Sequence, residues 1–262
     1  MDTISLAREY LLRSQEPDGS WASGDPLVCA RALYALQDGA PDEVFILGLK
    51  YLEGTQAPDG HFSGRTGMYS DASNTAYSLI VLNRFDYGKA SLPISRGILW
   101  LLENQCEDGS WGSNRIKKAY TTTLCLRALH TFYLSGIARF ARGLGFSLQY
   151  VEKLDLAAEP VSHIYAPILN LKRIGYLDET LESRFIDHAV GASKKAVDGG
   201  EVADAAYLLG TLKALGESEV SPILEDWLAS VQSDGGGFGK DLASPPAPNW
   251  TALAVLALTG RL

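Results

Sequence analysis

Three aspartates lie at the starts of predicted helices, where a carboxyl group can act as an acid or as a helix cap. Asp25, Asp71 and Asp204 each precede or begin a run of apolar residues with helical spacing. A carboxyl group enclosed by apolar side chains is held in its protonated form and can donate a proton. An aspartate at the start of a helix also serves as its cap, because its side-chain oxygen accepts backbone N–H bonds. For Asp71 and Asp204 both uses stay open at this point.

A short phrase that recurs four times shows how the chain positions these residues. It reads QEPDGSW at 15–21, QAPDGHF at 56–62, QCEDGSW at 105–111 and QSDGGGF at 232–238. Each copy lies between two apolar segments of helical period, so each marks the turn of a helical hairpin. Gly supplies the positive φ of a tight reversal, and Gln can reach unpaired backbone groups at a helix end. The final Trp or Phe is expected to pack as a wedge between neighbouring hairpins.

The phrases mark four hairpins, and the long interval between the third and fourth phrases is expected to contain two more hairpins that lack the phrase, which gives six. The second helix of each pair is rich in small and apolar residues, which favours an inner layer surrounded by more amphipathic first helices. The last helix is expected to close onto the first. We therefore predict an all-α fold, a single (α/α)6 barrel or toroid that forms one domain over residues 1–262. The predicted helices cover 3–15, 25–38, 41–55, 71–85, 91–105, 120–135, 138–154, 160–175, 178–196, 201–215, 218–232 and 247–260.

The composition disfavours several classes of protein, among them nucleic-acid-binding, membrane-spanning and disulfide-rich proteins. The chain is 46% hydrophobic and carries a formal charge of −8, which disfavours nucleic acid as a partner because a phosphate backbone requires a basic face. No apolar run is long enough for a membrane span and no signal peptide is evident, so we expect a soluble, cytoplasmic protein. The three cysteines lack metal-ligand or disulfide spacing. The oligomeric state cannot be inferred.

The repeated phrase resembles that of squalene-hopene and oxidosqualene cyclases, and the likeness extends over the whole chain. The segments at 235–240 (GGGFGK) and 250–258 also resemble the β-subunits of protein prenyltransferases. The resemblance implies a toroid of helical hairpins, with working groups at the N-terminal ends of the inner helices around an apolar cavity. A class II terpene cyclase with a single domain is the most similar kind of protein.

The same resemblance suggests a catalytic motif. Class II cyclases donate a proton from the middle Asp of D-x-D-D-T-A, and this chain reads D-A-S-N-T-A at 71–76. Ser73 therefore stands at the donor position and Asn74 beside it, while Asp71 is the retained carboxylate. A serine cannot protonate an alkene. We accordingly expect Asp71 to be the acid, with Ser73, Asn74 or a nearby tyrosine as its hydrogen-bonding partner, or the activity to be absent.

The comparison with prenyltransferases predicts that no metal is bound. Their zinc ligands lie in D-x-C-Y and in a later His-Thr pair. The matching positions here keep Asp204 but hold Ala206 and Trp250 in place of Cys and His. One carboxylate does not replace a thiolate and an imidazole, so we expect neither zinc nor another cofactor.

Several aromatic residues on the inner helices are candidates for contact with substrate, since aromatic faces stabilise cations. Ordinary core packing is the alternative for each of them. The substrate-binding candidates, together with the rim carboxylates Asp25 and Asp204, are Tyr69, Tyr77, Tyr120, Tyr165, Tyr207 and Trp250.

These observations predict a metal-independent isoprenoid cyclase that protonates a polyprenyl chain, including chains with an aromatic or other polar head group. Arg115, Lys117 and Lys118 could contact an anionic head. The basic amphipathic segment 137–154 suggests peripheral membrane contact, with an ordinary outer helix as the alternative. Two other functions stay open: a non-catalytic toroid that binds a lipophilic ligand or a protein, and a glycosidase in which Asp71 faces Asp25, Glu201 or Asp204.

Overall fold

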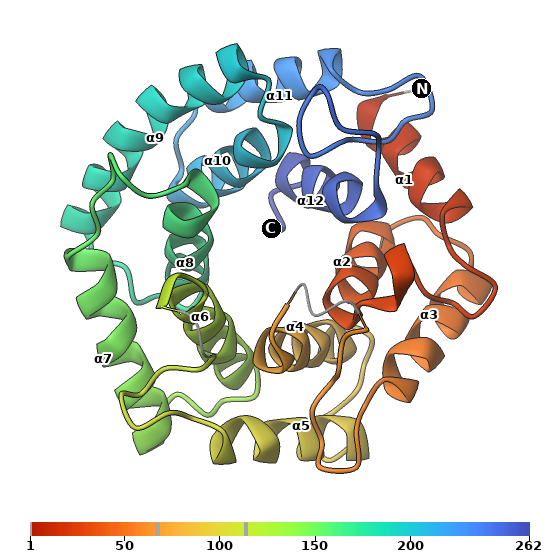
Figure 1. Ribbon diagram of the computed structural model, residues 1–262, viewed down its shortest axis with the longest axis vertical. Helices are drawn as coiled ribbons and strands as arrows, with labels where there is room; N and C mark the ends of the chain where they lie inside the picture. Colours follow the sequence, from red (N-terminus) through yellow and green to blue (C-terminus); the bar gives the residue numbers. More distant parts are fainter. Residues whose placement is uncertain (1, 66–68, 113–114) are drawn as a thin grey trace. The chain divides into compact units, whose positions relative to one another are not determined.

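The computed structural model describes residues 2–65, 69–112 and 115–262, without the side chains of 23 and 115–117. In this part of the chain the fold is all-α, as predicted, and contains twelve α-helices (Figure 1). Their bounds are α1 Thr3–Arg13, α2 Pro26–Leu36, α3 Asp42–Gly54, α4 Asp71–Arg84, α5 Leu92–Glu103, α6 Arg115–Thr131, α7 Ala138–Glu152, α8 Val161–Arg173, α9 Glu179–Gly199, α10 Val202–Leu215, α11 Ser221–Ser230 and α12 Pro248–Leu258.

Each predicted helix is present, including the two hairpins that lack the repeated phrase. The largest difference at a helix start is in α6, which begins at Arg115 and not at 120. The polar run that precedes the apolar stretch of α6 is therefore helical, although its composition resembles a loop. The chain separates into two compact units, a middle unit of Gln15–Lys153 and a terminal unit of Met1–Ser14 with Leu154–Leu262. The single domain and the closed ring stay predictions.

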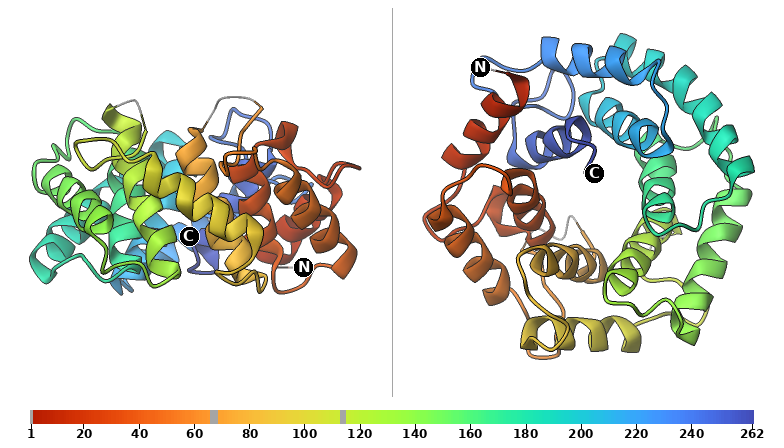
Figure 2. Two further views of the ribbon diagram at one scale, coloured as in Figure 1. Left: turned by 90° about the horizontal axis from the view of Figure 1, so that it is seen from below. Right: turned by 180° about the vertical axis from the view of Figure 1, so that it is seen from behind.

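Within the middle unit, the second helices α2, α4 and α6 pack side by side, and α3, α5 and α7 cover them on one side (Figures 1 and 2). Nearly every residue of α2 and α4 is buried, because these helices have neighbours on several sides. The covering helices bury only one face; in α5 this face consists of Ile94, Gly97, Ile98 and Leu101. The predicted distinction between apolar second helices and amphipathic first helices is confirmed.

The terminal unit has the same two layers. Helix α10 lies between α8 and α12, and α9 and α11 pack against α10. Helix α1 packs on α12, so the expected contact between the first and the last helix is confirmed (Figure 1). Tyr10 Oη donates a hydrogen bond to the Pro246 carbonyl at 2.9 Å, and the Arg13 guanidinium donates one to the Gly235 carbonyl at 2.6 Å.

The glutamine of the phrase joins each turn to another helix. In all four phrases its amide donates one hydrogen bond to the glycine carbonyl of its own turn and one to a carbonyl in the first turn of a first helix. For Gln105 these acceptors are Gly109 and Arg139, both at 2.8 Å. The same bonds join Gln15 to Gly19 and Val44, Gln56 to Gly60 and Pro93, and Gln232 to Gly236 and Thr3.

The wedge role of the turn aromatics is also confirmed. Trp111 is fully buried, and its indole N–H donates to the Leu101 carbonyl of α5 at 2.7 Å. On the other side it lies against α7, where a Cβ at Gly143 would be only 2.7 Å from the ring. Gly109 has φ +85°, and a Cβ there would lie 2.6 Å from the Arg142 carbonyl oxygen. The glycines thus permit a close approach between the turn and the next first helix.

Candidate active site

The start of α4 differs from the expectation for Asp71. The N-cap is Ser70, whose hydroxyl accepts a hydrogen bond from the Ser73 N–H at 3.2 Å, and Asp71 follows as the first helical residue. The side chain of Asp71 is exposed and borders an open hollow of about 420 Å³. The expectations that Asp71 is the cap and that an apolar cavity encloses it are therefore wrong. The hollow is lined by Ser70, Asp71, Ala72, Trp100, Asn104, Cys106, Gly112 and Lys118.

The two positions beside the retained aspartate are buried and join the second helices. Ser73 Oγ lies 2.8 Å from Thr121 Oγ1 of α6 and 3.0 Å from Ser70 Oγ. Asn74 Oδ1 accepts a hydrogen bond from the Leu27 N–H of α2 at 3.3 Å. Ser73 and Asn74 therefore hold the starts of α2, α4 and α6 together, and neither contacts an exposed carboxylate as a catalytic partner would.

Thr75, the threonine of the motif, binds the turn phrase. Its hydroxyl accepts a hydrogen bond from the Phe62 N–H at 2.9 Å. Thr122 does the same for Trp111, and Thr251 for Phe238. This structural role was missed from the sequence, although a Thr near the start of three second helices was a usable signal.

Asp25 is the buried carboxylate of the middle unit. It immediately precedes α2, and its side chain is 1% exposed. A Cβ at Gly64 would lie 2.3 Å from Asp25 Oδ1 and 2.8 Å from Asn74 Nδ2, so these two side chains converge on the backbone at Gly64. The structure thus brings Asp25 and Asn74 together. This placement leaves Asp25 in the interior of the middle unit.

Asp204 is a candidate carboxylate of the terminal unit. It lies in the first turn of α10, and its side chain is half-buried. Burial raises the pKa of Asp204, the nearby Glu201 carboxylate raises it further, and Lys240 acts in the opposite direction. The residue at the N-cap position of α10 is Glu201, so the interpretation of Asp204 as a helix cap is wrong.

The aromatic candidates occupy different settings. Tyr77 is 4% exposed, and the Arg31 guanidinium carbon lies 5.7 Å from the centre of its ring. Burial raises the pKa of Tyr77. Tyr165 is fully buried, and its hydroxyl lies 2.6 Å from Nδ1 of His188 on α9. Tyr165 therefore packs between α8 and α9. All six aromatic residues stay candidates for substrate contact, and those that are half-buried are Tyr69, Tyr120, Tyr207 and Trp250.

The remaining expectations were an anionic head-group site, a membrane surface and the lack of a metal site. Among the described residues, no three His, Cys, Asp or Glu side chains come together as metal ligands. Lys118 forms an ion pair with Asp108 at 3.0 Å, while the side chains of Arg115 and Lys117 lie outside the described residues.

Helix α7 packs on α6 and buries Phe140, which is typical of an outer helix. Within the described part of the chain, no helix is both long and apolar enough to cross a bilayer.

Comparison with known sequences places these observations in a family context. Residues 28–128 match the model of the squalene-hopene cyclase C-terminal domain. This part of the chain is similar to enzymes of the terpene cyclase superfamily. Drimenyl diphosphate synthase of Streptomyces showdoensis is 29% identical over 124 residues, which are 43% of this chain and 23% of that protein. Squalene-hopene cyclase of Zymomonas mobilis is 32% identical over 127 residues, which are 41% of this chain and 19% of that enzyme.

The matched part therefore spans less than a quarter of each of these two relatives. Solved structures share the fold over nearly the full length. A protein from Actinoplanes has a TM-score of 0.70 at 13% identity and covers 99% of this chain and 98% of its own. A novel alpha-amylase from Clostridium perfringens has a TM-score of 0.68 at 12% identity, with 98% and 97% covered. At such identities the likeness shows the fold alone.

Proposed function

We propose that this protein is a class II isoprenoid cyclase, which starts the reaction by protonating a polyprenyl chain. The match of residues 28–128 to the squalene-hopene cyclase domain carries this proposal. The relatives, named as a squalene-hopene cyclase and a drimenyl diphosphate synthase, support an isoprenoid substrate. The half-buried aromatic residues on second helices, Tyr207 and Trp250 among them, suit a substrate that becomes cationic.

We assign the proton donor to Asp204. An acid that protonates an alkene must be held in its neutral form and must also be reachable by the substrate. The side chain of Asp71 is exposed, whereas that of Asp25 is fully enclosed. Asp204 is half-buried at the start of a second helix, and both its burial and Glu201 favour the protonated carboxyl group.

The proposed step is balanced without a metal or an oxidant. The carboxyl O–H of Asp204 gives its proton to a trisubstituted double bond of the chain. A new C–H bond and a tertiary carbocation form, and the carboxylate stays behind. A second double bond attacks the cation and closes a ring. Loss of a proton from carbon ends the reaction, and Asp204 regains its proton from water, so the product is an isomer of the substrate.

The test is turnover of a polyprenyl panel by the wild type and by two variants. Squalene, farnesol and geranylgeraniol are incubated with the protein, and cyclic products are measured by gas chromatography with mass spectrometry. We expect Asp204→Asn to lower turnover by at least about 10²-fold, the lower end of what a positioned acid supplies. Equal turnover in Asp204→Asn and the wild type would refute the assignment of the acid.

Glu201→Gln is the matched control on the same helix end. Removal of the Glu201 charge lowers the pKa of Asp204, because that carboxylate helps to raise it. Activity needs the protonated form, so it is present below this pKa and is lost as the pH rises through it. We therefore expect Glu201→Gln to keep its activity at low pH and to lose it at a lower pH than the wild type.

One observation favours a second function, a non-catalytic protein that binds a lipophilic ligand. Ser73, at the position of the family's proton donor, takes part in a hydroxyl network with Ser70 and Thr121. This network joins helices and offers no acid. The same panel separates the two functions, because a binding protein would retain squalene or geranylgeraniol and return it unchanged with every variant.

A further inference from the structure

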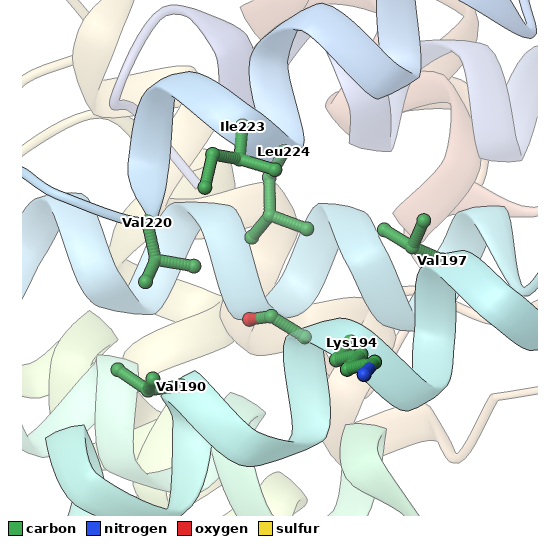
Figure 3. Close-up of a pocket in the computed structure, with 7 residues that line it drawn as sticks. Val190, Lys194, Val197, Val220, Ile223 and Leu224 are labelled. Carbon is green, nitrogen blue, oxygen red and sulfur yellow. The ribbon is translucent and has the colours of Figure 1, made fainter.

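A hollow of about 270 Å³ lies between α9 and α11 in the terminal unit. Figure 3 shows side chains of the two helices on either side of it. Ile223 and Val190, which line the hollow, are 61% and 40% exposed. The hollow is lined by Val190, Ser193, Lys194 and Val197 of α9, and by Val220, Ile223 and Leu224 at the start of α11.

The hollow lies at a junction where the repeated phrase is missing. Between α5 and α7 the corresponding space holds Trp111, which contacts Leu101 on one side and Gly143 on the other. The turn between α9 and α10 consists of Gly200 and Glu201 and has no aromatic residue. The aliphatic side chains of α9 and α11 therefore have no aromatic residue of this turn between them, whereas Trp111 fills the space between α5 and α7.

One positive charge lines the hollow. Lys194 is exposed, and among the described residues its ammonium group forms no ion pair or hydrogen bond. At the start of α11 the Glu217 carboxylate accepts hydrogen bonds from the backbone N–H groups of Glu219, Val220 and Ser221 at 2.5–3.1 Å. Because this carboxylate places a negative charge at the helix start, Lys194 is the group that would attract an anion at the hollow.

We propose that this hollow binds a single-chain anionic amphiphile, with its hydrocarbon tail between α9 and α11 and its anionic head on Lys194. A cavity of about 150 Å³ holds benzene, so a cavity of this size has room for roughly ten carbon atoms. A neutral or cationic amphiphile gains only the apolar contacts. None of the lining residues belongs to the proposed acid site, so this inference goes beyond the cyclase function.

Isothermal titration with decanoate, below its micelle concentration, tests the site in the full chain. We expect saturable binding of one decanoate, weaker binding of 1-decanol and still weaker binding of decyltrimethylammonium. Lys194→Gln should weaken decanoate binding about three-fold, the scale of an exposed ion pair, and leave 1-decanol unchanged. Lys195→Gln is the matched control, because this adjacent lysine does not line the hollow and its loss should change nothing.

Val190→Trp places an aromatic ring where the wedge is missing. It should abolish decanoate binding and leave the circular dichroism spectrum and the melting temperature at or above those of the wild type. If that variant does not fold, the exposed Ile223→Asp provides the same test by placing a negative charge at the hollow.

Three results would overturn the proposal. The first is decanoate binding that survives both Lys194→Gln and either of the two blocking variants. The second is equal affinity for the three amphiphiles. The third is a dimer in solution that Ile223→Asp converts to a monomer, because the hollow would then be covered by a second copy of the chain.

Discussion

Trp111→Ala tests the role of the repeated phrase in stability. The side chain is fully buried between α5 and α7, and its indole N–H is bonded to the Leu101 carbonyl. Truncation of a buried Trp costs about 3–5 kcal/mol of unfolding free energy. For a chain of this length each kcal/mol lowers the melting temperature by roughly 2–4 °C. We therefore expect a decrease of about 10 °C or more.

The assay is thermal and urea unfolding followed by circular dichroism, with two controls. Trp111→Phe keeps most of the apolar body and loses the hydrogen bond, so it should cost about 1–2 kcal/mol. Trp227→Ala removes a half-buried Trp of α11 outside any phrase, and it should cost less than Trp111→Ala. An unchanged melting temperature in Trp111→Ala, accompanied by loss of isoprenoid binding, would show that the phrase serves the ligand and not the fold.

Three further predictions concern the turn, the pH and metal ions. Gly109→Ala should cost at least about 1 kcal/mol in urea unfolding, since its φ is +85° and a Cβ meets the Arg142 carbonyl, whereas Gly145→Ala, with open space around it, should not destabilise. Burial lowers the pKa of His188 in the folded protein below its ordinary value of 6.5. The contribution of His188 to the free energy of unfolding is therefore fully present above pH 6.5 and is lost as the pH falls through the folded-state pKa. The melting temperature should therefore decrease below pH 6.5, and less so in His188→Gln. Cyclisation should continue in EDTA, because the proposed step uses only a carboxyl group; activity that disappears with EDTA and returns with zinc would contradict this.

The fold could be predicted from the sequence because its signals are local and repeated. Each hairpin has its own helical period, and the phrase marks four of the turns, so even α8 to α10 were found by spacing. The second hydrogen bond of each glutamine could not be predicted. It joins residues far apart in the sequence, such as Gln232 and Thr3, and no local pattern encodes that contact.

The candidate site was harder to predict, because the burial of a side chain at the start of a helix depends on the direction in which it points from the first turn. Asp71 and Asp25 both stand at the start of second helices, yet one is exposed and the other enclosed. Motif register favoured Asp71, whereas the structure puts Ser70 in the cap and directs Asp71 to an open hollow. The raised pKa of Asp204 depends on its burial and on Glu201, which the sequence alone does not reveal.

Cyclisation in deuterium oxide is the most direct test of protonation as the first step. A polyprenyl substrate that is turned over in this solvent should give a cyclic product with one deuterium bound to carbon, because the exchangeable proton of Asp204 is delivered to the double bond. Asp204→Asn should give no labelled product. A cyclic product that contains no deuterium would contradict the account, since ring closure would then begin without a proton from an exchangeable acid.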